Sequence, residues 1–278
     1  LASFYLIIGV IFGASAVLLT AGQYIEQLNG ASTTTVSYIL LAVCTLLLLG
    51  RVHWLGKIAF AVSVIAATVL FSGGLKSLIS HTDPIAIATS FNFSNFSYAI
   101  LILFWAIFGW EIIGNYSADV IEPKKTITRA IIMSMIVISI VYLVVAAAMQ
   151  WSNLSELSDG SLTITSIIYP LFGNASYVIM AMLALFLCSS TYFLYIGGVS
   201  RLVASMANEK VLPAILNKRT SHGIPVIAVL SISVLIIGVL GFVQAGLFHL
   251  ATLVAFANSF LTINALIGIL AGIVLIPN

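Results

Sequence analysis

Glu111 is the residue of this chain best suited to chemistry, because it places a carboxyl group inside an apolar stretch. Residues 105–129 read WAIFGWEIIGNYSADVIEPKKTITR, and a basic loop follows the apolar part at once. An ionisable group within a membrane span is costly and usually faces a bundle interior or water. Two interpretations stay open: a hydrogen-bonded carboxyl that ties two helices together, or a gating or proton-carrying group that lines a cavity.

Residues that weaken a helix surround this glutamate. Gly109 lies between two aromatic residues just before it, and Gly114 and Asn115 follow. Together they predict a helix that is unwound over residues 107–110. Unwound backbone offers carbonyl groups to an ammonium ion, and helix N-termini attract a carboxylate. An amino acid carries both charges, so this segment indicates a zwitterionic substrate.

Other polar or aromatic side chains occur in apolar stretches. The Trp105 indole could contact a substrate side chain or cation, or pack against lipid or neighbouring helices. Tyr192 and Tyr195 lie among hydroxyl-bearing and small residues, which more often serve helix packing but could also reach a polar cavity. Asn258 and Asn264 each need a partner, either another helix or a substrate.

The composition indicates that the solvent of this chain is lipid. Its 278 residues are 62% hydrophobic and only 6% charged, against roughly 25% charged residues in a soluble domain. The net charge of +2 and the absence of a basic patch interleaved with aromatic residues argue against nucleic-acid binding. We therefore expect an integral, multi-pass membrane protein.

No motif of an enzyme or of a metal or cofactor site is present. The sequence has no nucleophile–base arrangement, no HExxH pattern and no phosphate-binding loop. Cys44 and Cys188 lie in apolar runs, and the four histidines have no metal-ligand spacing. We expect no catalysis and no cofactor, and any transport must use ion gradients, exchange or the gradient of the substrate.

A helix needs about 20 apolar residues to cross a bilayer, and the sequence offers eight candidate spans within one transmembrane domain, residues 1–278. Assigning the loops 51–57, 118–129 and 204–223 to the cytoplasm, together with Arg201 at the adjoining end of the sixth span, places nine of the ten Lys and Arg inside, with only Lys76 outside. This alternation supports the span count and predicts that both ends face the cytoplasm, in the cell membrane. The expected spans are 3–22, 35–50, 57–75, 96–117, 129–149, 174–203, 224–243 and 247–275.

Three segments resemble the amino acid–polyamine–organocation permeases. Residues 104–131 (FWAIFGWEIIGNYSADVIEPKKTITRAI) resemble the sixth helix of that superfamily, residues 197–230 its eighth helix with the following cytoplasmic extension, and residues 250–272 its tenth helix. Within the superfamily, the chain looks closest to exporters of methionine and branched-chain amino acids. The resemblance implies an all-α bundle of two inverted five-helix repeats. The eight spans would be the third to tenth helices, with two further helices upstream.

The resemblance also implies roles for particular residues. Backbone carbonyls near Trp105 and Phe108 would receive the substrate amine, the Trp105 side chain would contact the substrate or act as a gate, and Tyr195 would be an aromatic gate. The broken first helix, which would hold the substrate carboxylate, is not in this chain. The expected substrate-binding residues are Trp105, Ile107, Phe108, Gly109, Tyr195 and Asn258, with Glu111 as the gating or proton-carrying group.

One departure from the family concerns ion coupling. Proton-coupled relatives carry a lysine within the fifth helix, where this chain has Ser63 or Val64. Coupling through such a lysine is therefore not expected. Coupling to protons or sodium, uniport, exchange, and export with Glu111 as the proton carrier all stay open, as does the oligomeric state.

These observations favour a secondary transporter that moves neutral amino acids by alternating access, with substrate bound at the broken span 96–117. The first alternative is an exporter of apolar amino acids such as methionine or branched-chain ones, since Trp105, Ile107 and Phe108 suit an apolar side chain. An alternative of another class is a membrane sensor or assembly subunit built on the same scaffold without transport.

Overall fold

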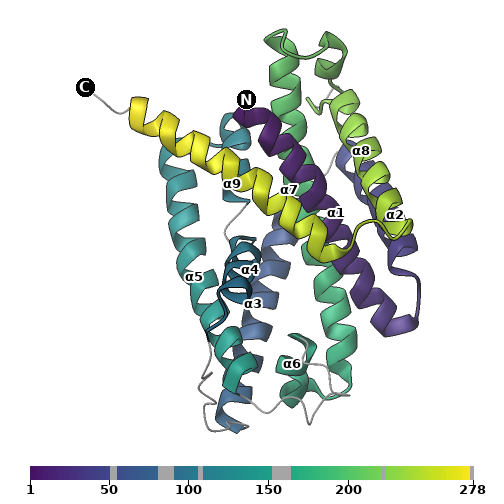
Figure 1. The fold of residues 1–278 in the computed structure, drawn as a ribbon, viewed down its shortest axis with the longest axis vertical. Helices are drawn as coiled ribbons and strands as arrows, with labels where there is room; N and C mark the ends of the chain where they lie inside the picture. Colours follow the sequence, from purple (N-terminus) through teal and green to yellow (C-terminus); the bar gives the residue numbers. More distant parts are fainter. Residues whose placement is uncertain (51–54, 81–90, 106–108, 152–163, 221–222, 276–278) are drawn as a thin grey trace.

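The computed structural model describes residues 1–50, 55–80, 91–105, 109–151, 164–220 and 223–275 (Figure 1). This part of the chain is almost entirely helical, and its only β-type pairing is one bridge between Arg219 and Pro225. The expectation of an all-α protein is confirmed. The helices are α1 (Ala2–Asn29), α2 (Thr33–Leu49), α3 (Leu55–Ser80), α4 (Phe93–Phe104), the 3₁₀ helix η1 (Trp110–Asp119), α5 (Pro123–Trp151), α6 (Ile164–Phe172), α7 (Ala175–Asn208), the 3₁₀ helix η3 (Ala214–Asn217), α8 (Val226–Gln244) and α9 (Leu250–Leu275).

Helix α1 runs through the middle of the molecule and packs most extensively on α7 and α9, with α2 and α8 alongside (Figure 1). Its inward positions are buried and small or branched, as at Val10, Ala14 and Leu18. At Gly9, an added Cβ would lie 2.8 Å from Leu261 Cγ, so α9 approaches α1 more closely than any other residue type would allow. Small residues along α1 therefore set the spacing of the largest core.

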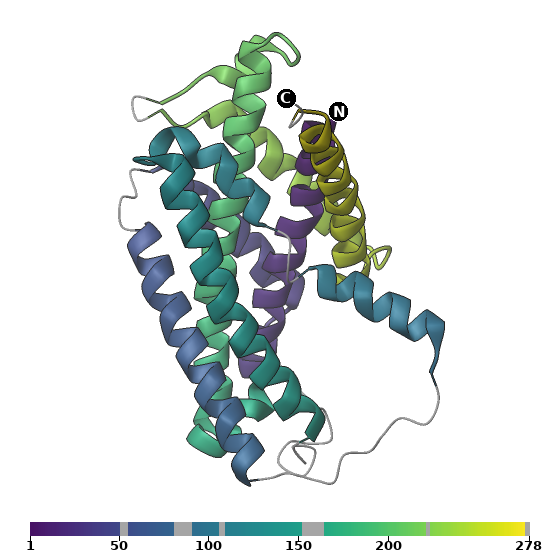
Figure 2. The same cartoon turned by 90° about the vertical axis from the view of Figure 1, so that its left-hand side faces the viewer.

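Helices α3, α5 and α6 form a second group at one side of this core. Helix α3 packs on α5, α6 and α7, and Figure 2 shows α3 and α5 running side by side. Helix α5 keeps large apolar side chains such as Ile132 and Leu143 more than half exposed. Exposed apolar surface of this extent suits a lipid environment.

Six of the described helices are long and apolar enough to cross a membrane, namely α1, α3, α5, α7, α8 and α9. Each overlaps one of the expected spans, and the expected span 35–50 corresponds to α2, which has 17 residues. The ends differ: α1 continues to Asn29, where Gly30 with φ 73° terminates it, and α5 begins at Pro123, not near 129. Proline fits the first turn of a helix because that position needs no N–H donor.

Within the expected span 96–117, helix α4 ends at Phe104 and η1 begins at Trp110, in keeping with the predicted interruption of this span. One feature of the fold was not predicted. The short helix α6 precedes the expected sixth span, in a segment that we read as loop, and it carries Pro170 near its end. A helix of 9 residues gives too short an apolar pattern to be recognised reliably.

The helix ends segregate in space. Helices α1, α3 and α5 begin at the upper end of the molecule, and α7 and α9 end there (Figures 1 and 2). The turn from α1 to α2 lies lower in both views. The chain therefore traverses the bundle in the alternating order that the loop charges predict.

Candidate functional site

The break between α4 and η1 is the central feature of the candidate site. Helix α4 ends at Phe104, and η1 begins at Trp110 after Gly109, which has φ 121° and ψ −21°. This positive φ is readily adopted only by glycine, so Gly109 permits the chain to change direction where a continuous helix would otherwise run. Of the residues expected at this break, Ile107 and Phe108 lie outside the described residues.

Glu111 lies in the first turn of η1, directly after the break. Its side chain lies outside the described part of the structure, so its role stays a prediction.

Two aromatic residues meet the backbone of α1 and the break. A Cβ built on Gly13 of α1 would lie 3.3 Å from Trp105 Cη2 and 3.3 Å from Tyr195 Cε2. A Cβ on Gly109 would lie 3.3 Å from the Tyr195 hydroxyl oxygen. Tyr195 is buried and Trp105 is half-buried. The structure therefore brings Trp105, Gly109 and Tyr195 together, although Tyr195 is distant from the other two in the sequence.

Asn258 reaches the same broken helix from α9. Its Nδ2 donates a hydrogen bond to the Leu101 carbonyl of α4 at 2.5 Å, and the residue is fully buried. Its Oδ1 has no hydrogen-bond partner among the described residues. Asn258 thus contacts the half-helix that leads into the break, three residues before that helix ends.

Helix η1 lies closely on α7 through a pair of glycines. A Cβ on Gly197 would lie 2.5 Å from the Tyr116 hydroxyl oxygen, and a Cβ on Gly198 would lie 2.5 Å from Ile112 Cγ2. The Tyr116 hydroxyl donates to the Leu194 carbonyl at 2.9 Å. Glycine at both positions therefore lets the second half of the broken helix approach α7 directly.

The Arg201 side chain packs on Tyr116 at one end of this contact between η1 and α7. The Arg201 guanidinium carbon lies 4.5 Å from the centroid of the Tyr116 ring, and Nη1 donates to the Gly197 carbonyl at 3.0 Å. A guanidinium at this distance over an aromatic face is attracted by the ring electrons. Sequence reasoning did not identify Tyr116 or Arg201, because the two are far apart in the chain and each type is common near membrane surfaces.

The Tyr192 hydroxyl contacts two hydroxyl groups of other helices and is not part of the break. Its hydroxyl lies 2.8 Å from Thr45 Oγ1 and 3.3 Å from Ser233 Oγ, and those two oxygens lie 3.1 Å apart. This buried triad joins α7, α2 and α8. The packing interpretation of the hydroxyl groups in this span therefore applies to Tyr192.

A cavity of about 560 Å³ lies between α3, α7 and η1. Its lining includes Ser63, Ser190, Thr191, Tyr116 and Arg201. Of the expected substrate-binding residues that the structure describes, namely Trp105, Gly109, Tyr195 and Asn258, none lines this cavity. Ser63, one of the two residues expected from the resemblance to stand where proton-coupled relatives carry a lysine, is among the residues that line it. Among the described residues, no group of three or more His, Cys, Asp or Glu could hold a metal ion.

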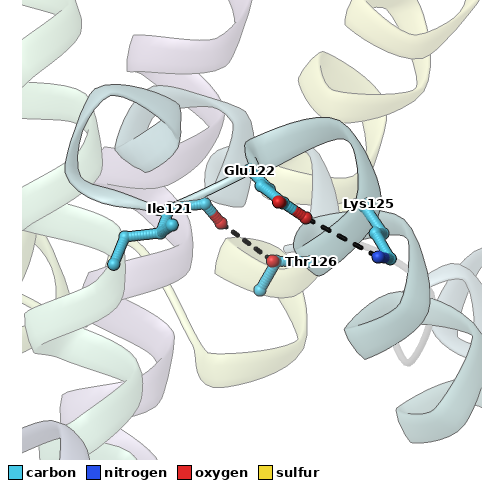
Figure 3. A network of polar contacts seen from close by, with 4 residues as sticks. All are labelled: Ile121, Glu122, Lys125 and Thr126. Atoms are coloured by element: carbon cyan, nitrogen blue, oxygen red, sulfur yellow. Dashed lines mark hydrogen bonds and ion pairs between the residues drawn. The ribbon is translucent and has the colours of Figure 1, made fainter.

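The elbow from η1 to α5 is held by local polar contacts (Figure 3). Thr126 Oγ1 donates to the Ile121 carbonyl at 2.9 Å, and the Lys125 and Thr126 N–H groups donate to the Glu122 carbonyl at 3.1 and 2.9 Å. The Lys125 ammonium lies 3.7 Å from the Glu122 carboxylate, and both side chains are well exposed. Glu122 has φ 49°, a conformation that non-glycine residues rarely adopt.

Two comparisons show what this chain is similar to. A family model described as amino acid permease matches residues 1–276. An uncharacterized protein of Methanocaldococcus jannaschii is 28% identical over 130 residues, which cover 45% of this chain and 29% of that protein. The aligned part thus spans less than a third of the length of this relative.

Proposed function

The chain belongs to the amino acid permease family, a family of transporters and not of enzymes, and from this we propose that it carries amino acids across a membrane as a secondary transporter. We propose further that the substrate binds at the break between α4 and η1 and that transport proceeds by alternating access. The observation that carries the proposal is this break, with Gly109 at φ 121° against the Tyr195 side chain and within a bundle of membrane-length helices.

The break suits a zwitterion. The C-terminal end of α4 carries the negative end of the helix dipole, and carbonyls that lose their helical partners there can accept hydrogen bonds from an ammonium group. We therefore place the substrate amine near Trp105 and Phe108. The substrate carboxylate needs a positive helix N-terminus, which the family resemblance assigns to the broken first helix of the fold.

The aromatic residues suit the substrate side chain. Trp105 and Tyr195 both contact the α1 backbone at Gly13, and neither brings a charge to the site. Together with Ile107 and Phe108 they would form an apolar surface, which favours a neutral substrate. The same surface is compatible with an exporter of methionine or branched-chain amino acids.

Glu111 and Asn258 are the remaining residues of the proposed substrate site. Glu111 stands directly after the break, where uptake or loss of a proton would change the charge beside the substrate. Asn258 is linked to the half-helix before the break. Coupling to protons through Glu111 and coupling to sodium differ in their dependence on pH and sodium, whereas exchange and uniport differ in whether transport needs substrate on the opposite side of the membrane.

Placement in the membrane is part of the proposal. The loops 51–57, 118–129 and 204–223 would lie in the cytoplasm, on the side where α5 begins and α7 ends (Figures 1 and 2). We propose that the protein is a multi-pass protein of the cell membrane.

A transport assay tests the function directly. Full-length protein in liposomes would be tested with a panel of labelled amino acids at varied pH and sodium, in both directions. We expect saturable transport of neutral amino acids, and about a tenfold higher KM for Trp105→Ala, the effect of removing one large apolar contact. Phe242→Ala on the exposed face of α8 is the matched control and should leave KM unchanged.

Glu111→Gln in the same assay tests the proton role. A proton-carrying Glu111 predicts that the pH dependence of transport disappears in this variant, whereas a purely hydrogen-bonded role predicts that it persists. Absence of any amino-acid transport by the folded full-length protein would overturn the proposed function and favour a sensor or assembly subunit.

A further inference from the structure

The hydrogen bond from Asn258 to Leu101 joins two segments that are 157 residues apart in the chain. The amide is fully buried, and its Nδ2 lies 2.5 Å from the carbonyl oxygen. Because a carbonyl only accepts hydrogen bonds, the amide must present its nitrogen there and not its oxygen. The orientation of the Asn258 side chain is therefore determined by α4.

Leu101 belongs to the last turn of α4, since the helix ends at Phe104. The last four carbonyls of a helix have no intrahelical partner, and within a bilayer an unsatisfied carbonyl is expensive. In most helices solvent or a following loop supplies donors. Here a side chain of a distant helix supplies one.

We propose that Asn258 is a positioning residue that caps the broken half-helix α4 from α9, and thereby fixes the direction of the carbonyls that the substrate amine would meet. This inference rests on the proposed function for its effect on transport, while the cap itself can be tested without transport. It gives Asn258 a role as a donor to the protein, different from direct contact with the substrate.

The packing of α9 on α1 explains why Asn258 is held in position. Ala257 and Leu261, one position before Asn258 and three after it, meet Gly9 of α1: a Cβ there would lie 2.8 Å from Leu261 Cγ and 3.4 Å from the Ala257 carbonyl oxygen. Helix α9 is thus held on α1 on both sides of Asn258 along the chain. Helix α4 makes its principal helix contact with α9. Asn258 therefore donates its hydrogen bond from a helix that is itself held on the central helix α1.

The decisive variant is Asn258→Asp. Its ionised carboxylate cannot donate and repels the Leu101 carbonyl, whereas its protonated form can donate an O–H to the same oxygen. We expect transport by Asn258→Asp, relative to wild type at the same pH, to rise as the pH falls. Asn258→Leu should show about a tenfold higher KM at every pH, the effect expected when one buried carbonyl loses its donor.

Asn264 provides the matched control, since it is on the same helix and has no hydrogen bond in the described structure. Asn264→Asp and Asn264→Leu should keep the wild-type KM and pH profile. Higher relative activity of Asn258→Asp at high pH would overturn the cap and indicate that Asn258 accepts a hydrogen bond from the substrate ammonium. A wild-type KM for Asn258→Leu would overturn it as well.

Hydrogen exchange separates failure of the cap from failure of the proposed function. Amides of the segment 97–105 should exchange about tenfold faster in Asn258→Leu than in wild type, without substrate. In Asn258→Asp, the exchange relative to wild type should be fast at high pH and return toward wild type at low pH. Unchanged exchange in both variants refutes the cap even if amino acids are transported, and faster exchange supports it even if none is.

Discussion

Two separate features favour glycine at position 109: its backbone conformation and the close approach of Tyr195. Its φ of 121° lies in a region that side chains rarely tolerate, and the Tyr195 hydroxyl oxygen would lie 3.3 Å from any added Cβ. Either feature alone would favour glycine. Together they tie the shape of the break to the position of α7.

Replacing Gly109 by alanine should therefore disturb the break while the helices stay inserted. We expect roughly 1–3 kcal/mol of backbone strain and a large loss of amino-acid transport. Uptake into liposomes and thermal unfolding in detergent measure the two effects. Gly268→Ala is the control, because a Cβ on Gly268 of α9 meets nothing within 4 Å and should leave both quantities near wild type. Normal transport by Gly109→Ala would show that the break is not where substrate binds.

Much of this site was predictable at the level of single residues. Gly109, Gly114 and Asn115 weaken a helix, and a charge beside them is costly in lipid, so the break could be located from local composition. The partners of Asn258 and Tyr195 could not, because they depend on how α4, α7 and α9 are placed in space. Tyr192 shows the converse case: its type and position resemble those of Tyr195, yet its hydroxyl belongs to a triad with Thr45 and Ser233.

At the scale of elements, the two halves of the broken helix are held in different ways. Helix α4 makes its principal contact with α9 and is anchored by one side-chain amide. Helix η1 lies against α7 over Gly197 and Gly198 with Tyr116 and Ile112 as its contacts. The first half thus depends on a polar bond and the second on close packing, so the two respond to different substitutions.

Gly198→Ala should displace η1 from α7. Its Cβ would lie 2.5 Å from Ile112 Cγ2, a separation that requires one of the helices to shift. Overpacking of this kind costs about 1–3 kcal/mol, and we expect thermal stability and transport to fall together. The double variant Gly198→Ala, Ile112→Ala removes the colliding methyl group and should recover part of both.

Gly238→Ala on α8 is the control for this test, because no atom lies within 4 Å of the added Cβ. If Ile112→Ala fails to relieve the effect of Gly198→Ala in any measure, the close contact between η1 and α7 is not its cause.

At the scale of the whole molecule, charge and topology agree. The helix ends that gather at the upper end of Figure 1 carry the basic residues of the loops 118–129 and 204–223, while α3 ends with Lys76 near its other end. Positive charge gathers on the cytoplasmic side of membrane proteins. The alternation could be predicted because it depends only on span count and loop composition. The short helix α6 could not be predicted in this way, because 9 residues give too short an apolar pattern.

Cysteine labelling tests this topology in cells. In a background in which Cys44 and Cys188 are replaced by alanine, Lys218→Cys should react with a membrane-impermeant thiol reagent only after the membrane is opened. Lys76→Cys should react in intact cells. The reverse pattern, or labelling of both residues from one side, would contradict the proposed orientation.

The triad of Thr45, Tyr192 and Ser233 has a consequence for how such a bundle can move. The three hydroxyl oxygens lie within hydrogen-bond distance of one another, and Ser233 also donates to the Val229 carbonyl, so α2, α7 and α8 are linked at one depth by polar contacts. Sliding of one of these helices past the others would break such contacts. In the proposed transport cycle, movement between these three helices would therefore cost hydrogen bonds, and movement elsewhere in the bundle would leave the triad intact.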